Sequence, residues 1–92
     1  MNDINEIDLE KVFTKKLGMR SSAKKLFTDL DNSSSEVVLN FQNIEFMSRS
    51  FAQEYLYQKK NSRLTIVETN MSDFIKGMFG VVEKDFEETL GY

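Results

Sequence analysis

Residues 37–60 of the chain read VVLNFQNIEFMSRSFAQEYLYQKK and contain two different hydrophobic periodicities. The first five residues form an apolar run with the length and β-branched content of a buried strand. Beyond residue 50, apolar side chains recur at helical spacings, and the hydroxyl residues just before them are typical of a helix start. The segment therefore predicts a strand that leads through Ser48, Arg49 and Ser50 into a helix, which closes near Lys59 and Lys60.

Elements of the same two kinds are expected on both sides of this segment. Strands are expected over Ile4–Leu9, Glu36–Phe41 and Leu64–Val67. One helix is expected to be capped by Ser21 or Ser22 and to end near Asp31, before a surface turn at Asp31–Ser35. A last helix is expected behind Ser72 and is predicted to break near Gly80, because glycine weakens helices, leaving a separate piece over Val82–Leu90.

This alternation of strands and helices predicts a small α/β domain. Parallel strands joined by right-handed crossovers would form a mostly parallel sheet of about four strands, covered by three to four helices. The chain contains no proline, and its four glycines do not cluster, so nothing resembles a linker. We therefore expect residues 1–92 to form one domain.

The composition excludes several classes of function. The chain has no histidine and no cysteine, which removes the commonest nucleophiles, general bases and metal ligands, so an enzyme is not expected. The carboxylates are assigned to solvated helix surfaces, and no metal or cofactor is expected. A net charge of −3 argues against a nucleic-acid binder. The N-terminal residues lack the pattern of a signal peptide and no apolar run is long enough to cross a membrane, so we expect a cytoplasmic protein.

Three roles are open for the serines before the second predicted helix. Ser48 or Ser50 can cap the helix, contribute with Arg49 to an anion site at the helix N-terminus, or accept a covalent phosphate. A second loop, Gly18–Ser21, also leads into a helix and carries Arg20; such a loop is more often a simple turn, and the alternative is that it faces the same crevice beyond the carboxyl ends of the strands. The aromatic residues are expected in the core first, with Phe51 the strongest candidate for an exposed interface residue.

Residues Val38–Phe41 and Phe46–Phe51 resemble the central segment of STAS domains, the module of bacterial anti-sigma factor antagonists and sulfate transporter tails. Those domains have a strand with an apolar-Asp-apolar pattern, a loop of the type Phe-Ile-Asp-Ser-Ser-Gly, and then a helix. The likeness spans roughly residues 15 to 86. Arg20-Ser21-Ser22-Ala23 and the Ser-Arg-Ser-Phe-Ala loop are most similar to STAS-like domains of unknown function.

The resemblance implies a STAS-like fold and a regulatory role through protein binding. In the phosphoregulated antagonists, the second serine of the loop accepts phosphate from an ATP-binding partner kinase, and phosphorylation ends the partnership. Ser50 occupies that position, whereas Ser48 replaces the family's aspartate and Phe51 its glycine. The expected partner is thus an ATP-binding regulator of the serine-kinase or anti-sigma type.

Two functions of different classes follow for the same region. The first is a non-enzymatic interaction module whose surface includes Phe46–Phe51, Arg20 and the outer side of the second helix near Gln53, Glu54 and Tyr57. The second is a sensor that binds a nucleotide or another anion directly, through Arg49 and the amides of the helix N-terminus.

Overall fold

The computed structural model describes the backbone of residues 4–30 and 36–90 and the side chains of residues 6–30 and 36–85. Within these ranges the elements, in chain order, are β1 (Ile4–Asp8), α1 (Leu9–Phe13), β2 (Lys16–Leu17), α2 (Arg20–Leu30), β3 (Glu36–Asn40), β4 (Phe46–Met47), α3 (Arg49–Lys60), β5 (Thr65–Thr69) and α4 (Asp73–Leu90). The predicted α/β class is confirmed. The expected turn at Asp31–Ser35 lies outside the described residues.

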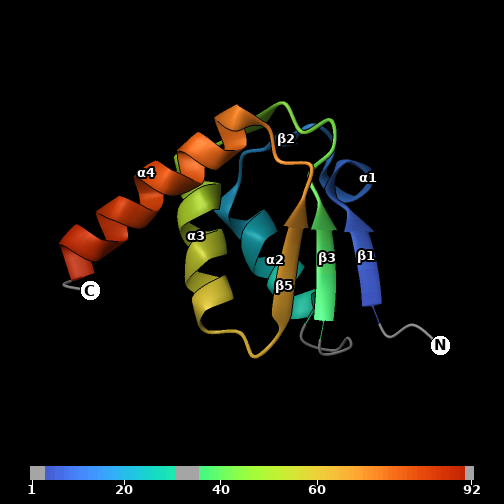
Figure 1. The fold of residues 1–92 in the computed structure, drawn as a ribbon, viewed down its shortest axis with the longest axis horizontal. Helices are drawn as coiled ribbons and strands as arrows, with labels where there is room; N and C mark the ends of the chain where they lie inside the picture. Colours follow the sequence, from blue (N-terminus) through green and yellow to red (C-terminus); the bar gives the residue numbers. More distant parts are fainter. Residues whose placement is uncertain (1–3, 31–35, 91–92) are drawn as a thin grey trace.

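The strands form two parallel groups rather than one sheet. The larger sheet has the order β1-β3-β5, with β3 in the middle, and the smaller one pairs β2 with β4. In register, Ile7 lies opposite Leu39, and Leu39 opposite Glu68. Helices α2 and α3 lie behind the three long strands in Figure 1 and cover one face of this sheet, whereas α4 lies to the side of it. The expectation that helices would cover the whole sheet is met on that face only.

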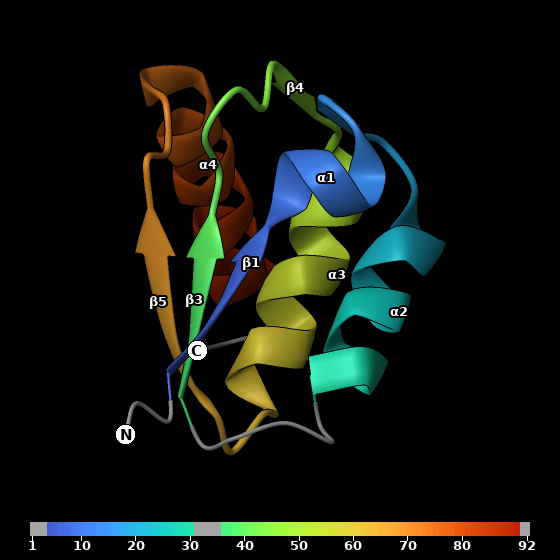
Figure 2. The ribbon, with the colours of Figure 1, turned by 90° about the vertical axis from the view of Figure 1, so that its right-hand side faces the viewer.

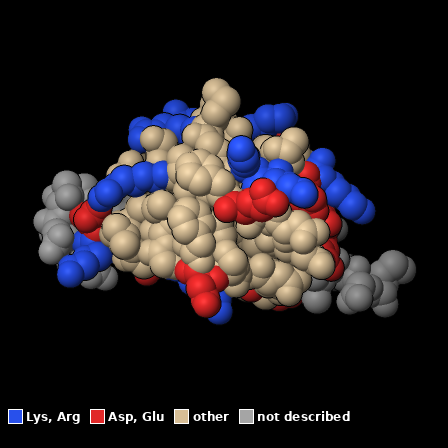
Figure 3. Space-filling model, turned by 90° about the horizontal axis from the view of Figure 1, so that it is seen from above, with Lys and Arg blue, Asp and Glu red and all other residues tan. Residues whose placement is uncertain are grey.

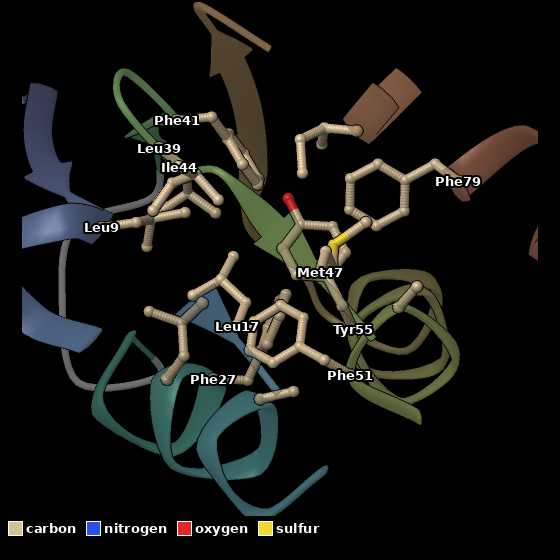
Figure 4. Close-up of a cluster of buried hydrophobic side chains, with 14 of the residues drawn as sticks. Leu9, Leu17, Phe27, Leu39, Phe41, Ile44, Met47, Phe51, Tyr55 and Phe79 are labelled. Carbon is tan, nitrogen blue, oxygen red and sulfur yellow. The ribbon is translucent and has the colours of Figure 1, made fainter. Parts of the chain in front are cut away.

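The core fills the space between β3 and the helices. Val37 and Leu39 point into it from β3, whose burial alternates along the strand. The ring of Tyr55 on α3 lies at its centre, surrounded by aromatic rings from three other elements (Figure 4). Its centroid lies 5.4 Å from that of Phe27, 6.2 Å from that of Phe41 and 4.9 Å from that of Phe79. Because such pairs add about 0.5–1.5 kcal/mol each beyond burial, α3 holds the helices to the sheet.

The N-terminal region forms the predicted strand, β1, and continues directly into the short helix α1. β1 ends at Asp8, one residue before the predicted end, because the Asp8 carboxylate caps α1 by accepting the Glu10 N–H at 3.1 Å. Helix α2 begins at Arg20, so the prediction that Ser21 or Ser22 caps it is wrong. Both serines lie in its first turn. The other boundaries agree to within two residues, and α4 begins behind Ser72 as expected, with the Ser72 hydroxyl accepting the Ile75 N–H at 3.2 Å.

Helix α4 is continuous over Asp73–Leu90, and the predicted break near Gly80 is wrong. Ile75 and Val82 are fully buried, and Phe79 is 8% exposed, so one face of the helix is anchored on both sides of Gly80. Burying such side chains gains about 1.5–3 kcal/mol each, more than the roughly 1 kcal/mol that a helical glycine costs. Packing therefore overrides the local propensity.

Replacing Gly77 or Gly80 with alanine should stabilise the chain. Both glycines are helical, and an added Cβ would meet nothing within 4 Å at either position. We expect the free energy of unfolding to rise by about 0.5–1 kcal/mol for each substitution. Urea denaturation monitored by circular dichroism measures this change. A loss of stability in either variant would contradict the continuous helix.

Candidate functional site

The short β2–β4 pair brings the two predicted loops together. Leu17 lies opposite Met47 in this pair, so the chain leaves both strands at the same point. One exit leads through Gly18 into α2 and the other through Ser48 into α3. Both helices begin at the end of the molecule toward which the arrowheads of the strands point (Figure 2). The loops thus lie beyond the carboxyl ends of the strands, where ligands collect in α/β proteins.

Ser48 joins the two loops and starts α3. Its N–H donates to the Leu17 carbonyl at 2.8 Å, and its hydroxyl donates to the Gly18 carbonyl at 2.8 Å. The same hydroxyl oxygen accepts the Phe51 N–H at 3.0 Å, with the extended backbone that is usual at an N-cap. The capping role is therefore confirmed for Ser48, and its hydroxyl is occupied by two structural hydrogen bonds.

Ser50 and Arg49 lie in the first turn of α3 and differ in their surroundings. Ser50 is exposed to solvent. The Arg49 guanidinium forms an ion pair with the Asp85 carboxylate of α4, and Asp85 is only partly exposed. Arg49 therefore links α3 to α4 instead of pointing into open solvent, and an anion bound at this terminus would compete with Asp85 for it.

Arg20 contacts α3 at the surface of the molecule. Its guanidinium donates to the Gln53 side-chain carbonyl at 3.4 Å across the two helices. Gln53 lies three residues after Ser50, so the two share one side of α3. Arg20, Ser50 and Gln53 consequently contribute to one continuous surface.

Two of the predicted surface residues are buried, and their assignment to a binding surface is wrong. Phe51 has no exposed area, and its ring packs against those of Phe13 and Tyr55. Glu54 is only 8% exposed, and its carboxylate accepts the Gln58 side-chain amide at 2.7 Å. The reason is that α3 packs between α2 and α4 as well as beneath the sheet, so a wider part of its circumference is covered than one apolar stripe indicates.

Exposed apolar side chains lie elsewhere around the two loops. Met19 is 65% exposed next to Arg20, and Phe46 is 42% exposed in β4, whereas Tyr57, which is 55% exposed, lies farther away near the C-terminal end of α3. The Phe46 ring stacks on that of Phe74, at a centroid distance of 6.2 Å. Seen from above, this end of the molecule has a broad uncharged area beside a cluster of acidic and basic groups (Figure 3).

A buried polar group that sequence reasoning missed lies behind the site. The Tyr55 hydroxyl donates to the Glu68 carboxylate, which also accepts from the Lys59 ammonium at 3.0 Å. Burial raises the pKa of Tyr55 well above its ordinary value of 10.0, and the negative charge of Glu68 raises it further. The only signal in the sequence was an acidic residue, Glu68, directly after an apolar run. In the sheet this residue lies opposite Leu39.

No group of three or more metal-ligating side chains occurs among residues 6–30 and 36–85. In the same part of the chain, no helix has the length and apolarity that a membrane span requires.

The two serines should respond differently to truncation. Ser48→Ala removes the cap of α3 and the bond to Gly18, and we expect a loss of about 1–2 kcal/mol in the free energy of unfolding. Ser50→Ala should change it by less than about 0.5 kcal/mol, because Ser50 is exposed. Chemical denaturation of both variants measures the difference. Equal losses would contradict the separate roles of the two hydroxyls.

The stability of the chain should fall in alkali because of Tyr55. The folded state retains the Tyr55 proton above pH 10.0, where the unfolded chain releases it, so unfolding is favoured as the pH rises beyond that value. Tyr55→Phe should lower the free energy of unfolding by roughly 1.5–3 kcal/mol near neutral pH. Between about pH 9 and 11, however, the free energy of unfolding of this variant should fall less than that of the unchanged chain. Tyr57→Phe, at a tyrosine that is 55% exposed, is the matched control. If the free energy of unfolding of Tyr55→Phe falls with pH as steeply as that of the unchanged chain, this assignment is wrong.

Known proteins provide no counterpart for this site, since no protein-family model, curated protein or solved structure matches the chain. The likeness to STAS domains is carried by the quoted residues alone. What the site does must therefore be inferred from its geometry and chemistry.

Proposed function

We propose that this protein is a non-enzymatic, cytoplasmic interaction module whose partner binds at the N-terminus of α3. The observation that carries the proposal is the position of Ser50, which is exposed next to a hydroxyl that is already used in the fold. Exposed Phe46 precedes it in β4, and exposed Met19 and Arg20 stand on the adjoining loop. Apolar side chains beside one hydroxyl and one cation suit a protein partner better than a small ligand.

The same geometry suits a phosphate switch at Ser50. A phosphate there would add up to two negative charges in the first turn of α3, where the helix dipole favours them. The helix would remain intact, while the surface beside Phe46 and Arg20 would gain negative charge. Phosphorylation would thus act on the partner and not on the fold. By the resemblance to phosphoregulated antagonists, the partner is an ATP-binding regulator of the serine-kinase or anti-sigma type.

Direct binding of a nucleotide or another anion is the less supported function. It needs the Arg49 guanidinium and the amides of the helix N-terminus. Arg49 is paired with Asp85, and the Ser48 hydroxyl bonds to Gly18 and Phe51. An anion would have to displace these contacts, whereas a protein docked on Ser50 leaves them in place.

A pull-down from native lysate with three variants tests the switch. Ser50→Asp should lose at least about 80% of the captured partner, as the negative charge mimics phosphate, while Ser50→Ala should retain it. Ser72→Asp is the matched control, because it adds the same charge at the N-terminus of α4, where aspartate caps as well as serine does. Mass spectrometry identifies the partner and reads phosphate on Ser50. If Ser50→Asp captures the same proteins as the unchanged chain, the switch is wrong.

A further inference from the structure

Apart from Phe74, which stacks on Phe46 of β4, the outward side of α4 is exposed in the part of the chain that the structure describes. Its buried residues are Ile75, Phe79 and Val82. The exposed residues between positions 73 and 84 are Asp73, Phe74, Lys76, Gly77, Gly80, Val81, Glu83 and Lys84, which we call the outer face of α4. In Figure 1 this helix lies at the edge of the molecule, with α3 on its inner side.

The outer face has the spacing of a helix-pairing surface. Asp73, Gly77, Gly80 and Lys84 follow one another at steps of four, three and four residues, which is the seam along which two helices pack at a small angle. Two pairs seven residues apart flank this seam. The apolar pair Phe74 and Val81 lies on one side, and the charged pair Lys76 and Glu83 lies on the other.

The apolar members of this face are unusually exposed. Phe74 is 49% and Val81 is 53% accessible, and Phe46, which stacks on Phe74, extends the apolar area beyond the helix. Neighbouring exposed apolar side chains on one helix face mark a contact surface more often than a bare surface. The two glycines of the seam have open space above them, with nothing within 4 Å of an added Cβ. A second helix can therefore approach the backbone of α4 closely.

We propose that α4 packs antiparallel against α4 of a second copy of this chain, forming a symmetric dimer. A twofold axis that crosses the seam between Gly77 and Gly80 places Gly77 opposite Gly80, and Asp73 opposite Lys84, of the other copy. In an antiparallel pair, each flank meets the same flank of the partner helix. Phe74 then meets Val81, and Lys76 meets Glu83.

All of these pairings are complementary, and symmetry makes each occur twice. The parallel alternative is disfavoured by charge, since it would set Asp73 against Asp73 and Lys84 against Lys84. The contact covers about three helical turns, roughly 16 Å. A contact of this length buries less surface area than a standard stable interface, so the dimer should form reversibly and depend on concentration.

Sedimentation velocity over roughly micromolar to millimolar concentrations tests this dimer. The unchanged chain should shift from monomer to dimer, whereas Lys76→Glu or Glu83→Lys alone should weaken association by roughly tenfold or more, through two like-charge contacts. An equimolar mixture of these two variants should dimerise again, as should the double variant. Lys24→Glu, an exposed charge reversal on α2, is the control and should associate like the unchanged chain.

A second measurement separates the interface from folding. Gly80→Ala should raise the thermal midpoint of the monomer and yet weaken the dimer, because the added methyl group keeps the helices apart. Ser50→Asp should leave association unchanged, so the dimer and the partner switch can fail independently. The proposal is overturned if the chain stays monomeric at all concentrations, if the single charge reversals leave the dissociation constant of the dimer unchanged, or if mixing the two variants does not restore association.

Discussion

The hydroxyl of Ser48 is the constraint on which the arrangement of the site depends. It bonds at once to the Gly18 carbonyl and to the Phe51 N–H, while the Ser48 N–H bonds to Leu17. One residue thereby closes the β2–β4 pair, begins α3 and places the start of α2 beside it. Because this serine has a structural task, the hydroxyl two residues later is left to face solvent. The division of labour between Ser48 and Ser50 therefore follows from local hydrogen bonding.

Helix α3 connects this site with the rest of the molecule. Its N-terminus presents Ser50, its middle places Tyr55 among the aromatic rings of the core, and Arg49 ties its first turn to Asp85 of α4. Helix α3 is therefore fixed both by the core and by α4 where it presents the loop. The hydrogen bond from Tyr55 to Glu68 extends the same support to β5. A rigid helix of this kind suits a surface that must present one side chain in a constant position to a partner.

The sequence predicted what local patterns determine. The strand predicted at Glu36–Phe41, the helix ending at Lys59 and Lys60, and the helix that begins behind Ser72 all have short-range signals, and the structure has them to within one residue. The missed features depend on contacts far apart in the chain. Two-residue strands carry no periodicity, so the β2–β4 pair was not expected. The burial of Phe51 and Glu54 depends on where α2 and α4 pack, and the continuity of α4 depends on core contacts that outweigh two glycines. The pairing of Arg49 with Asp85 likewise joins residues 36 positions apart.

Amide hydrogen exchange, followed residue by residue with NMR, tests the central claim most directly. The amides of Ser48 and Phe51 are held by the bonds that join the loops and cap α3, so both should exchange slowly, through opening of the fold. The Ser50 amide lies in the first turn, where helices leave N–H groups without helical partners, and it should exchange much faster. Slow exchange at Ser50 together with fast exchange at Phe51 would contradict the assignment of the structural role to Ser48 and the exposed role to Ser50.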